Sequence, residues 1–377
     1  MPSVILANVG TPLIWATLFH MTFGNACIGV LEGTLLASLY RIPASRAIWL
    51  MILANYFSAW VGWSYLHLLV DRNNISLDNA ASVLAGTIVA AYATTLVLEW
   101  PFVAGCFWRA EKPLRRSVIA SILVQSISYV LLIGWYGLAS VNSLCTDLTV
   151  VPPDQIALPR DVCIYFIADE DGNVYSRELG TGQTRQVYDL KSRDFEDCLS
   201  FQVSESEAAF HKIVALLDPS DRNEPNVVDL DIAVHDENSP LREDGRPMMA
   251  DKFLSPSRGI APKLGSAYGS PWSFKAGFWA AQGLSGENTK TGEQFRFAIE
   301  TPFIRWNVRH AILLPGEQVL FQLGTRQVCI LDLKARKVAV LCFGYGAVAV
   351  LERDTREPKV CRKLHRPINA RRAERSG

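Results

Sequence analysis

The chain has 377 residues, which is enough for two domains, and a formal net charge of zero. The charge is unevenly distributed. Residues 1–144 contain seven Lys or Arg and five Asp or Glu, whereas the remaining residues contain 30 and 32. The second part therefore has the balanced surface of an ordinary soluble domain, and this excludes the basic footprint of a nucleic-acid-binding protein.

The first 144 residues contain four long, apolar segments that are almost free of charge. Each exceeds the roughly 20 residues that a helix needs to cross about 30 Å of hydrocarbon. The first segment lacks the basic start and the cleavage site of a signal peptide, so we expect it to remain in the protein. The sequence therefore predicts four transmembrane helices, at about residues 11–40, 47–70, 80–108 and 117–144.

Positive charge is concentrated in two of the three connections between these segments. Residues 41–46 and 109–116 carry two and four Lys or Arg, whereas residues 71–79 have one Arg against two Asp. The positive-inside rule then places the first and third connections in the cytoplasm. We expect an integral, multi-pass protein in contact with membrane lipids, with both termini on the non-cytoplasmic side.

Each apolar segment holds one carboxylate or amide nine or ten residues from its cytoplasmic Arg. At about 1.5 Å of rise per residue, these side chains lie roughly 13–15 Å from the cytoplasmic interface, near the bilayer midplane. One interpretation is that they bond the helices to each other. The other is a proton or ion relay, or a small-ligand site, since ionisable groups at this depth usually face an interior. This midplane polar layer consists of Glu32, Asn55, Glu99 and Gln125.

Two further patterns concern helix packing and the outer interface. Small or short residues recur every four positions in the first segment and predict a helix-packing stripe. His20 and His67 each lie 21 residues from a cytoplasmic Arg, about 31 Å away and near the outer interface. Such a pair could bind haem, although amphipathic residues are common at that depth in any case. We expect no cofactor, with haem as the competing possibility. The stripe consists of Asn25, Gly29, Gly33 and Ala37.

The apolar pattern ends at Leu144, and residues 145–161, with Pro152-Pro153, are predicted to be a linker. Short β-branched and aromatic runs separated by turns then predict a β-rich domain over residues 162–352. The basic residues 353–377 are predicted to be a disordered tail. The clearest predicted strands are residues 162–168, 174–179, 184–190, 318–323, 327–333, 338–343 and, after a break at Gly344 and Gly346, 347–351.

Two segments of the β-rich part resemble each other. Each has a strand, a tight turn and a strand that ends in Asp-Leu, at Asp189-Leu190 and at Asp332-Leu333. This arrangement is similar to the blades of β-propellers, and a sandwich of β-meanders fits as well. The expected fold class is a four-helix transmembrane bundle followed by an extramembrane β-rich domain that is propeller-like or sandwich-like.

The cysteines allow one disulfide prediction. A two-residue hairpin centred on Ala335-Arg336 would place Cys329 opposite Cys342, which makes a bond feasible in an extracytoplasmic domain. Two buried thiols would give the same pattern. The cysteine spacings match neither a zinc site nor a CxxC redox motif.

Sequence motifs for catalysis are absent. There is no GxSxG, Walker loop, HExxH or GxGxxG. The acidic turn at residues 169–173 falls short of the twelve-residue calcium loop. We therefore predict no catalytic residue and no metal site.

The preferred functional interpretation is non-enzymatic. We expect a membrane-anchored interaction or scaffolding protein that presents its β-rich domain outside the cytoplasm, such as a subunit of an envelope complex, with a protein partner or as a homo-oligomer. The alternative is an ion- or proton-conducting, transport or redox membrane subunit that uses the midplane polar layer. A membrane-embedded enzyme acting on lipid is a third, weaker interpretation.

Overall fold

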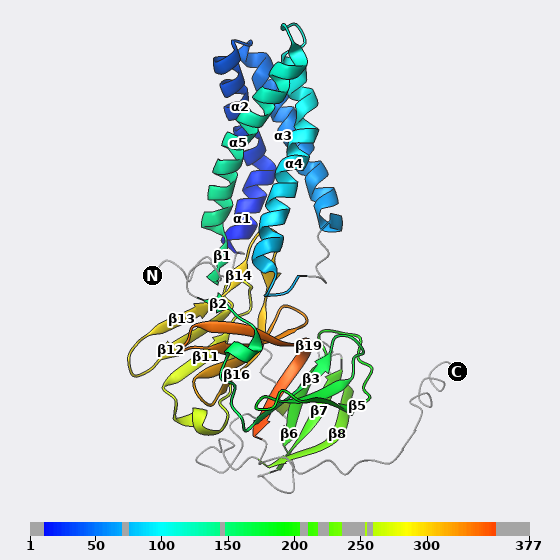
Figure 1. Cartoon of the computed structure of the whole chain (residues 1–377), viewed down its shortest axis with the longest axis vertical. Coiled ribbons are helices and arrows are strands. Elements are labelled where there is room, and N and C mark those ends of the chain that lie inside the picture. Colours follow the sequence, from blue (N-terminus) through cyan, green and yellow to red (C-terminus); the bar gives the residue numbers. More distant parts are fainter. Residues whose placement is uncertain are drawn as a thin grey trace, which may run out of the picture. The chain divides into compact units, whose positions relative to one another are not determined.

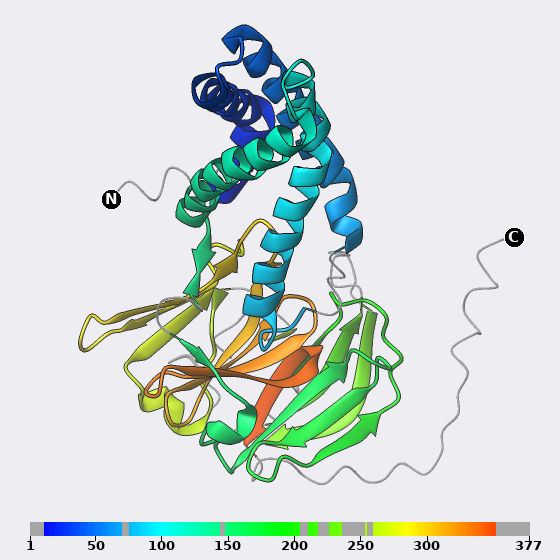
Figure 2. The ribbon, with the colours of Figure 1, turned by 45° about the horizontal axis from the view of Figure 1, so that its top comes forward.

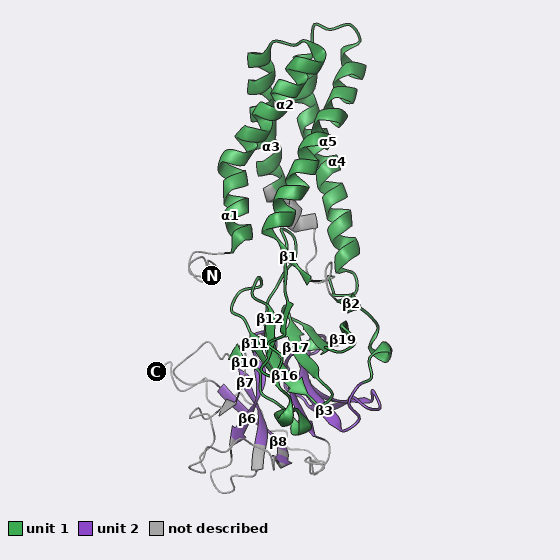
Figure 3. Cartoon of the chain, turned by 90° about the vertical axis from the view of Figure 1, so that its left-hand side faces the viewer, with its two compact units in different colours: residues 1–157, 256–344 green, residues 158–255, 345–377 purple. Residues whose placement is uncertain are grey.

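The computed structural model describes residues 11–69, 75–143, 148–203, 210–217, 226–235, 253–254 and 259–351. The chain divides into two compact units (Figure 3). The first unit comprises residues 1–157 and 256–344, and the second comprises residues 158–255 and 345–377. All the described helices of the apolar half therefore share a unit with the β-strands between residues 256 and 344. The predicted tail, residues 353–377, lies outside the described residues.

The first helix is continuous from Pro12 to Tyr40 but contains one wide turn. It consists of α1 (Pro12–Phe19), the π-helical turn η2 (His20–Gly24) and α2 (Asn25–Tyr40). Thr11 caps its start, where its side chain accepts a hydrogen bond from the Ile14 amide and Pro12 occupies the first turn. Arg41 adopts a left-handed conformation and ends the helix.

Three further helices complete the bundle: α3 (Ala44–Leu69), α4 (Ala80–Cys106) and α5 (Pro113–Ala139). Pro113 stands in the first turn of α5, so this helix begins earlier than predicted. It also ends at Ala139 rather than at residue 144, because Ser140 is extended and leads into a short strand. In both views, α4 and α5 meet at the connection after Cys106 and diverge from it (Figures 1 and 2).

Within the described residues, three helices are long and apolar enough to cross a membrane: Pro12–Tyr40, Ala80–Cys106 and Pro113–Ala139. With 26 residues, α3 is long enough, but its apolar run is interrupted by polar and amphipathic residues. By length and composition, the described residues thus support three of the four predicted spanning helices. The interrupting residues are Asn55, Tyr56, Ser58 and Trp60.

The β-strands of the first unit form a sheet in the order β10-β11-β12-β13, a small sheet β1-β14-β15, and the series β16-β17-β18-β19 with β2 parallel to β19. Their bounds are β1 Val141–Asn142, β2 Thr149–Val150, β10 Gly259–Ile260, β11 Trp272–Ala276, β12 Leu284–Asn288, β13 Gln294–Phe297, β14 Ile299–Glu300, β15 Arg305–Trp306, β16 Val308–Leu314, β17 Gln318–Leu323, β18 Gln327–Asp332 and β19 Lys337–Leu351. The predicted linker thus contains β2, followed by a 3-10 turn at Pro153–Gln155.

A single apolar core joins the start of α4 to these strands. Ile75, Leu77 and Ala80 are buried in the same cluster as Phe297 and Phe321. The amide of Leu77 donates a hydrogen bond to Gln327 Oε1 at 2.6 Å. The start of α4 and residues 75–79 before it are therefore packed against the β-structure of the first unit.

The second unit contains the meander β3-β4-β5, which joins the last part of β19, and the sheet β8-β7-β6-β9. Its core includes Ile167, Leu199, Ile213 and Val348. The strands are β3 Val162–Ala168, β4 Val174–Glu178, β5 Thr184–Tyr188, β6 Cys198–Val203, β7 Phe210–Leu217, β8 Asn226–His235 and β9 Phe253–Leu254.

The predicted strands at 162–168 and 318–323 are confirmed to the residue. The predicted break at Gly344 and Gly346 is wrong, because β19 runs through both as one strand of 15 residues. Gly346 has a φ of +60°, and a Cβ there would lie 2.5 Å from Cys198 Cα. The glycine thus permits a left-handed position and a close backbone approach inside a continuous strand.

Candidate functional site: a buried carboxyl pair in the helix bundle

The structure brings the four residues of the midplane polar layer together as two adjoining hydrogen-bonded groups. In the first group, Asn55 Nδ2 of α3 donates to Glu32 Oε2 of α2 at 2.6 Å and to the Met51 carbonyl at 3.0 Å. The Ser128 hydroxyl of α5 lies beside the same carboxyl group. Glu32 is fully buried, so a carboxyl group sits in the interior of the bundle.

The second group surrounds Glu99 of α4, which is 1% exposed. The Ser58 hydroxyl of α3 donates to Glu99 Oε1 at 2.5 Å. The Gln125 side-chain amide of α5 donates to Glu99 Oε2. Each carboxyl group therefore has hydrogen-bond partners on two neighbouring helices, α3 and α5. Such bonds hold the helices of a membrane bundle together.

The two carboxyl groups lie close enough to interact electrostatically with each other. Tyr129 also lies near both, and its hydroxyl is 2.8 Å from Thr95 Oγ1. Within the described part of the chain, neither carboxyl group has a Lys, Arg or His as hydrogen-bond or ion-pair partner. A buried pair of acids with only neutral partners can bind a proton without breaking an ion pair.

Close packing of α2 on α3 fixes the position of Glu32. Gly29 and Gly33, two members of the small-residue stripe, face the backbone of α3. A Cβ at Gly29 would lie 2.5 Å from Ile52 Cα, and one at Gly33 would overlap Ile48 Cα. The absence of side chains at these two positions lets the helix backbones approach so that Asn55 reaches Glu32. Asn25 is buried and Ala37 is half-buried.

Three buried polar atoms of the bundle lack a well-formed hydrogen bond within the described residues: Asn25 Nδ2, Glu32 Oε1 and Ser121 Oγ. Each belongs to a side chain that is at most 3% exposed. Buried polar atoms of this kind are usually satisfied by internal water. The Glu32 side of the site therefore has unused hydrogen-bonding capacity.

An apolar cluster separates the carboxyl groups from the bundle end at Arg41 and Lys112. Along each helix its members lie between the polar layer and that end, and the large ones are Leu36, Met51, Val103 and Phe107. At the same end, Trp108 has the guanidinium groups of Arg46 and Arg109 at 5.4 and 4.5 Å from its ring centroid. Such cation–aromatic pairs suit a membrane interface.

The outer-interface histidines do not form a described pair. His20 Nδ1 lies 2.7 Å from the Tyr136 hydroxyl of α5, and the Asn25 side chain is a second partner of the ring. His67 belongs to α3, but its side chain lies outside the described residues. Of the two histidines proposed as haem ligands, the structure describes only the side chain of His20. That ring is hydrogen-bonded within the protein.

The predicted Cys329–Cys342 disulfide is corrected by the strand register. Cys329 pairs with Val340, and Val328 pairs with Cys342, because a bulge lies between Val328 and Cys329. The Cys329 thiol is free, and burial raises its pKa well above the ordinary value. Cys329 is thus a buried apolar side chain of the core.

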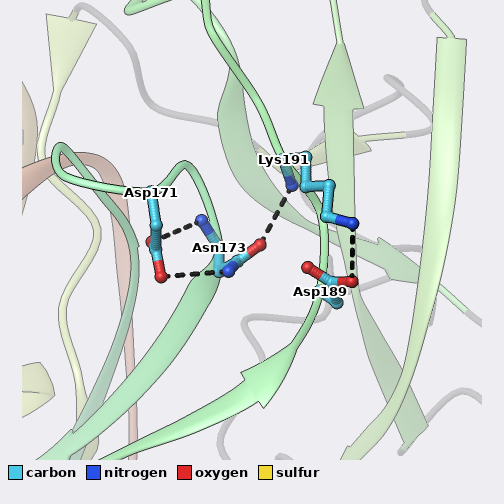
Figure 4. Close-up of polar contacts among 4 residues, drawn as sticks. All are labelled: Asp171, Asn173, Asp189 and Lys191. Atoms are coloured by element: carbon cyan, nitrogen blue, oxygen red, sulfur yellow. Dashed lines mark hydrogen bonds and ion pairs between the residues drawn. The ribbon is translucent and has the colours of Figure 1, made fainter.

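The acidic turn between β3 and β4 uses its polar groups internally (Figure 4). Asp171 accepts hydrogen bonds from the Asn173 amide and side chain at 2.9 and 3.0 Å. Asn173 Oδ1 accepts from the Lys191 amide, whose side chain pairs with Asp189 at 3.2 Å. Burial opposes ionisation of Asp171, but these hydrogen bonds and one from Tyr175 lower its pKa overall. The turn is a structural one, and the described residues contain no metal-binding cluster.

The sequence prediction missed three participants in the site. Ser58 and Ser128 bind or adjoin the carboxyl groups, and Tyr136 holds His20. Two of the missed residues carry a readable signal, since Ser58 follows Asn55 and Ser128 follows Gln125 by three positions, on the same helix face. The wide π turn at His20–Gly24 has no such signal in the sequence.

No family model matches the chain, and no curated protein matches it. Among solved structures, a nidogen/laminin complex matches 50% of this chain and 65% of that chain at 12% identity, with a TM-score of 0.19. TolB from Acinetobacter baumannii matches 54% of this chain and 46% of that chain at 11% identity, with a TM-score of 0.15. The chain thus covers less than two thirds of either structure. Similarities this weak say nothing about its function.

Proposed function

We propose that this protein is a membrane-anchored interaction protein that holds a β-rich surface against the non-cytoplasmic face of a membrane. The observation that supports this proposal most is the direct packing of the bundle end on the β-structure of the first unit. Leu77 bonds Gln327, and the Thr11 hydroxyl, at the start of α1, donates to buried Glu300 Oε1 at 3.1 Å. The starts of α1 and α4, which are far apart in the sequence, are thus both bonded to the β-structure of the first unit, residues 256–344, called the β-domain below.

The proposal includes α3 as a fourth membrane helix. Its side chains Asn55 and Ser58 bond carboxyl groups on the two neighbouring helices α2 and α4. A helix between two apolar helices can carry such groups because its polar face is covered. The positive charges near Arg41 and Lys112 support a cytoplasmic location for that end and a non-cytoplasmic one for the β-domain.

Native purification in mild detergent, followed by mass spectrometry and a visible absorption spectrum, tests this function. We expect a stoichiometric protein partner or a defined homo-oligomer with no Soret band. The complex should survive Glu32→Gln and be lost when residues 256–344 are deleted. A monomer without partner, or a complex retained after the deletion, would contradict the proposal. A Soret band that His20→Ala removes would restore haem.

The carboxyl pair supports a second candidate function, a proton- or ion-coupled role for the bundle. Glu32 and Glu99 are almost fully buried at one level, with neutral partners only among the described residues. Ionisable groups in this position commonly serve transport or coupling. In proteoliposomes with a pH-sensitive dye inside, the wild type should dissipate an imposed pH gradient faster than the double variant Glu32→Gln, Glu99→Gln. Equal rates would end this second candidate.

A further inference from the structure

One end of the bundle carries a concentrated positive charge. Residues 41–46 and 109–116, which join α2 to α3 and α4 to α5, meet at the top of Figure 1 and contain six Lys or Arg against one acid. All six cationic side chains are exposed, and none forms an ion pair with a carboxylate among the described residues. The cations are Arg41, Arg46, Arg109, Lys112, Arg115 and Arg116, and the acid is Glu111.

Two of these arginines converge on one aromatic ring. The guanidinium carbon of Arg46, in the first turn of α3, lies 5.4 Å from the ring centroid of Trp108, and that of Arg109 lies 4.5 Å from it. Arg46 Nη2 also donates to the Gly105 carbonyl, near the end of α4, at 2.6 Å. This bond uses one of the five N–H groups of a guanidinium, so both arginines keep donors for a ligand.

The close packing of α3 on α4 brings the two arginines together. A Cβ at Gly105 of α4 would lie 3.8 Å from Leu50 Cδ1 of α3. Arg46 precedes Leu50 by one turn, and Arg109 follows Gly105 by four residues. The pair is therefore a product of the contact between two helices, and neither connection alone would form it.

The charges of the two arginines suit a phosphate group. Two guanidinium groups at one ring repel each other, and an anion bound to both would reduce the repulsion. The planar guanidinium can donate two parallel hydrogen bonds to phosphate oxygens, which gives it a better match than an ammonium group. Basic side chains between membrane helices commonly bind anionic lipid headgroups in this way.

Apolar side chains beside the arginines favour a lipid over a free phosphate. Trp49 and Leu53 of α3 follow Arg46 by three and seven residues, so all three share one helix face. Trp49 is 67% exposed, Leu53 is 56% exposed and Trp108 is 59% exposed. Hydrocarbon chains would cover this face, and an exposed Trp is typical of the headgroup level.

We propose that Arg46 and Arg109, at the ring of Trp108, bind the phosphate of an anionic lipid in the leaflet on the Arg41 and Lys112 side. The phosphate oxygens accept hydrogen bonds from both guanidinium groups, and the acyl chains lie along the exposed face of α3. A zwitterionic lipid fits less well, because its own cation opposes the six positive charges. The inference rests on the membrane location that the proposed function assumes, but it needs neither a protein partner nor the carboxyl pair.

Native mass spectrometry of the full chain, released from mild detergent, counts the lipids that it binds. The probes are phosphatidylglycerol, which is anionic, and phosphatidylcholine with the same acyl chains, which has no net charge. We expect the wild type to bind phosphatidylglycerol about tenfold or more tightly than phosphatidylcholine. The double variant Arg46→Gln, Arg109→Gln should lose most of this preference.

The double variant Arg115→Gln, Arg116→Gln is the matched control. It removes the same charge from the same end of the bundle, at the start of α5, and leaves both arginines at Trp108 in place. It should keep most of the preference for phosphatidylglycerol. An equal loss in both double variants would mean that the attraction is spread over the whole end, and the arginine site would be wrong.

The fold of each variant is checked by thermal unfolding, because Arg46→Gln also removes the bond to the Gly105 carbonyl. Arg109→Gln alone leaves that bond in place and should lower the preference about fivefold. This single variant decides the question if the double variant is unstable. An unchanged preference in folded Arg109→Gln would overturn the proposed site.

Two further outcomes separate this inference from its alternatives. Inorganic phosphate at the lipid's concentration should not displace phosphatidylglycerol, since it has no chains to lie on α3; displacement would overturn the choice of a lipid. Equal binding of the two lipids by the wild type would overturn the inference and leave the protein complex of the proposed function untouched. Absence of that complex, with the lipid preference intact, would remove the proposed function alone.

Discussion

At the scale of single residues, His310 shows how a buried group ties stability to pH. It lies in β16, is 5% exposed, and its Nδ1 lacks a partner among the described residues. Burial, and then the charge of Arg309, lowers its pKa from 6.5 to about 4. The folded state therefore keeps the ring neutral where the unfolded state would protonate it.

The sign of the pH effect follows from this shift. Below the unfolded pKa the unfolded chain binds a proton that the folded one does not, so stability is lost as the pH falls from 6.5 towards 4. The loss is at most about 3 kcal/mol. Thermal unfolding of wild type and His310→Asn between these pH values checks it, since Asn tolerates the left-handed φ of +48°. An equal slope in both proteins would contradict the account.

Two turn glycines in consecutive hairpins have the same backbone conformation but differ in the space available for a side chain. Gly172 and Gly182 both have positive φ, +70° and +72°. A Cβ at Gly172 would overlap the Ser192 carbonyl oxygen, whereas one at Gly182 meets nothing within 4 Å.

Gly182→Ala should therefore cost only the left-handed conformation, about 1 kcal/mol. Gly172→Ala should cost about 2 kcal/mol more, because the Ser192 backbone must also move. Urea unfolding of both variants measures the difference. Equal costs would mean that the turn relaxes without strain.

At the scale of elements, the contact of α2 with α3 is the one that positions the carboxyl pair. Gly33→Ala places a methyl group against the Ile48 backbone and should destabilise the bundle by about 1–3 kcal/mol. Gly134→Ala in α5 is the matched control, because its Cβ meets nothing within 4 Å. It should change stability by less than about 1 kcal/mol.

Unfolding in mixed detergent micelles, followed by circular dichroism, compares the two variants. In Gly33→Ala the separation of the helices should also weaken the Asn55–Glu32 hydrogen bond. If Gly33→Ala is as stable as Gly134→Ala, the close approach of α2 and α3 is not required.

Much of the helical part could be predicted from sequence, because depth along a helix is a count of residues. The count placed Glu32, Asn55, Glu99 and Gln125 at one level, and the structure brings them into two adjoining groups. Rotation about each helix axis depends on packing, so the count could not show that Asn55 binds Glu32 while Gln125 binds Glu99. Nor did the count show that α3 is less apolar than the other three helices.

For the strands, the positions could be predicted from the sequence but the register between them could not. Short β-branched and aromatic runs between turns located β3 and β17 to the residue, but the register of a hairpin changes with a single bulge. The bulge between Val328 and Cys329 moved Cys329 opposite Val340. A bulge depends on the strands around it, and the local sequence carries too little of that information.

At the scale of the whole molecule, the units do not follow the order of the chain. The helices share a unit with residues 256–344, and residues 158–255 form the other with the end of β19. The sequence predicted one β-rich domain over residues 162–352, because no change in composition within that range marks a boundary between two units. What composition could not show is that Leu77 and Thr11 bind partners more than 240 residues away.

The account depends most on the bundle crossing a membrane with the β-domain on one side and the Arg41 and Lys112 connections on the other. Lys112 is the only lysine before residue 144, and Lys290 lies in the β-domain; both are exposed. Intact cells are treated with a membrane-impermeant amine reagent, and the modified lysines are identified by mass spectrometry before and after detergent. We predict that Lys290 is modified in intact cells and Lys112 only after detergent. Modification of both lysines, or of neither, in intact cells would contradict the account.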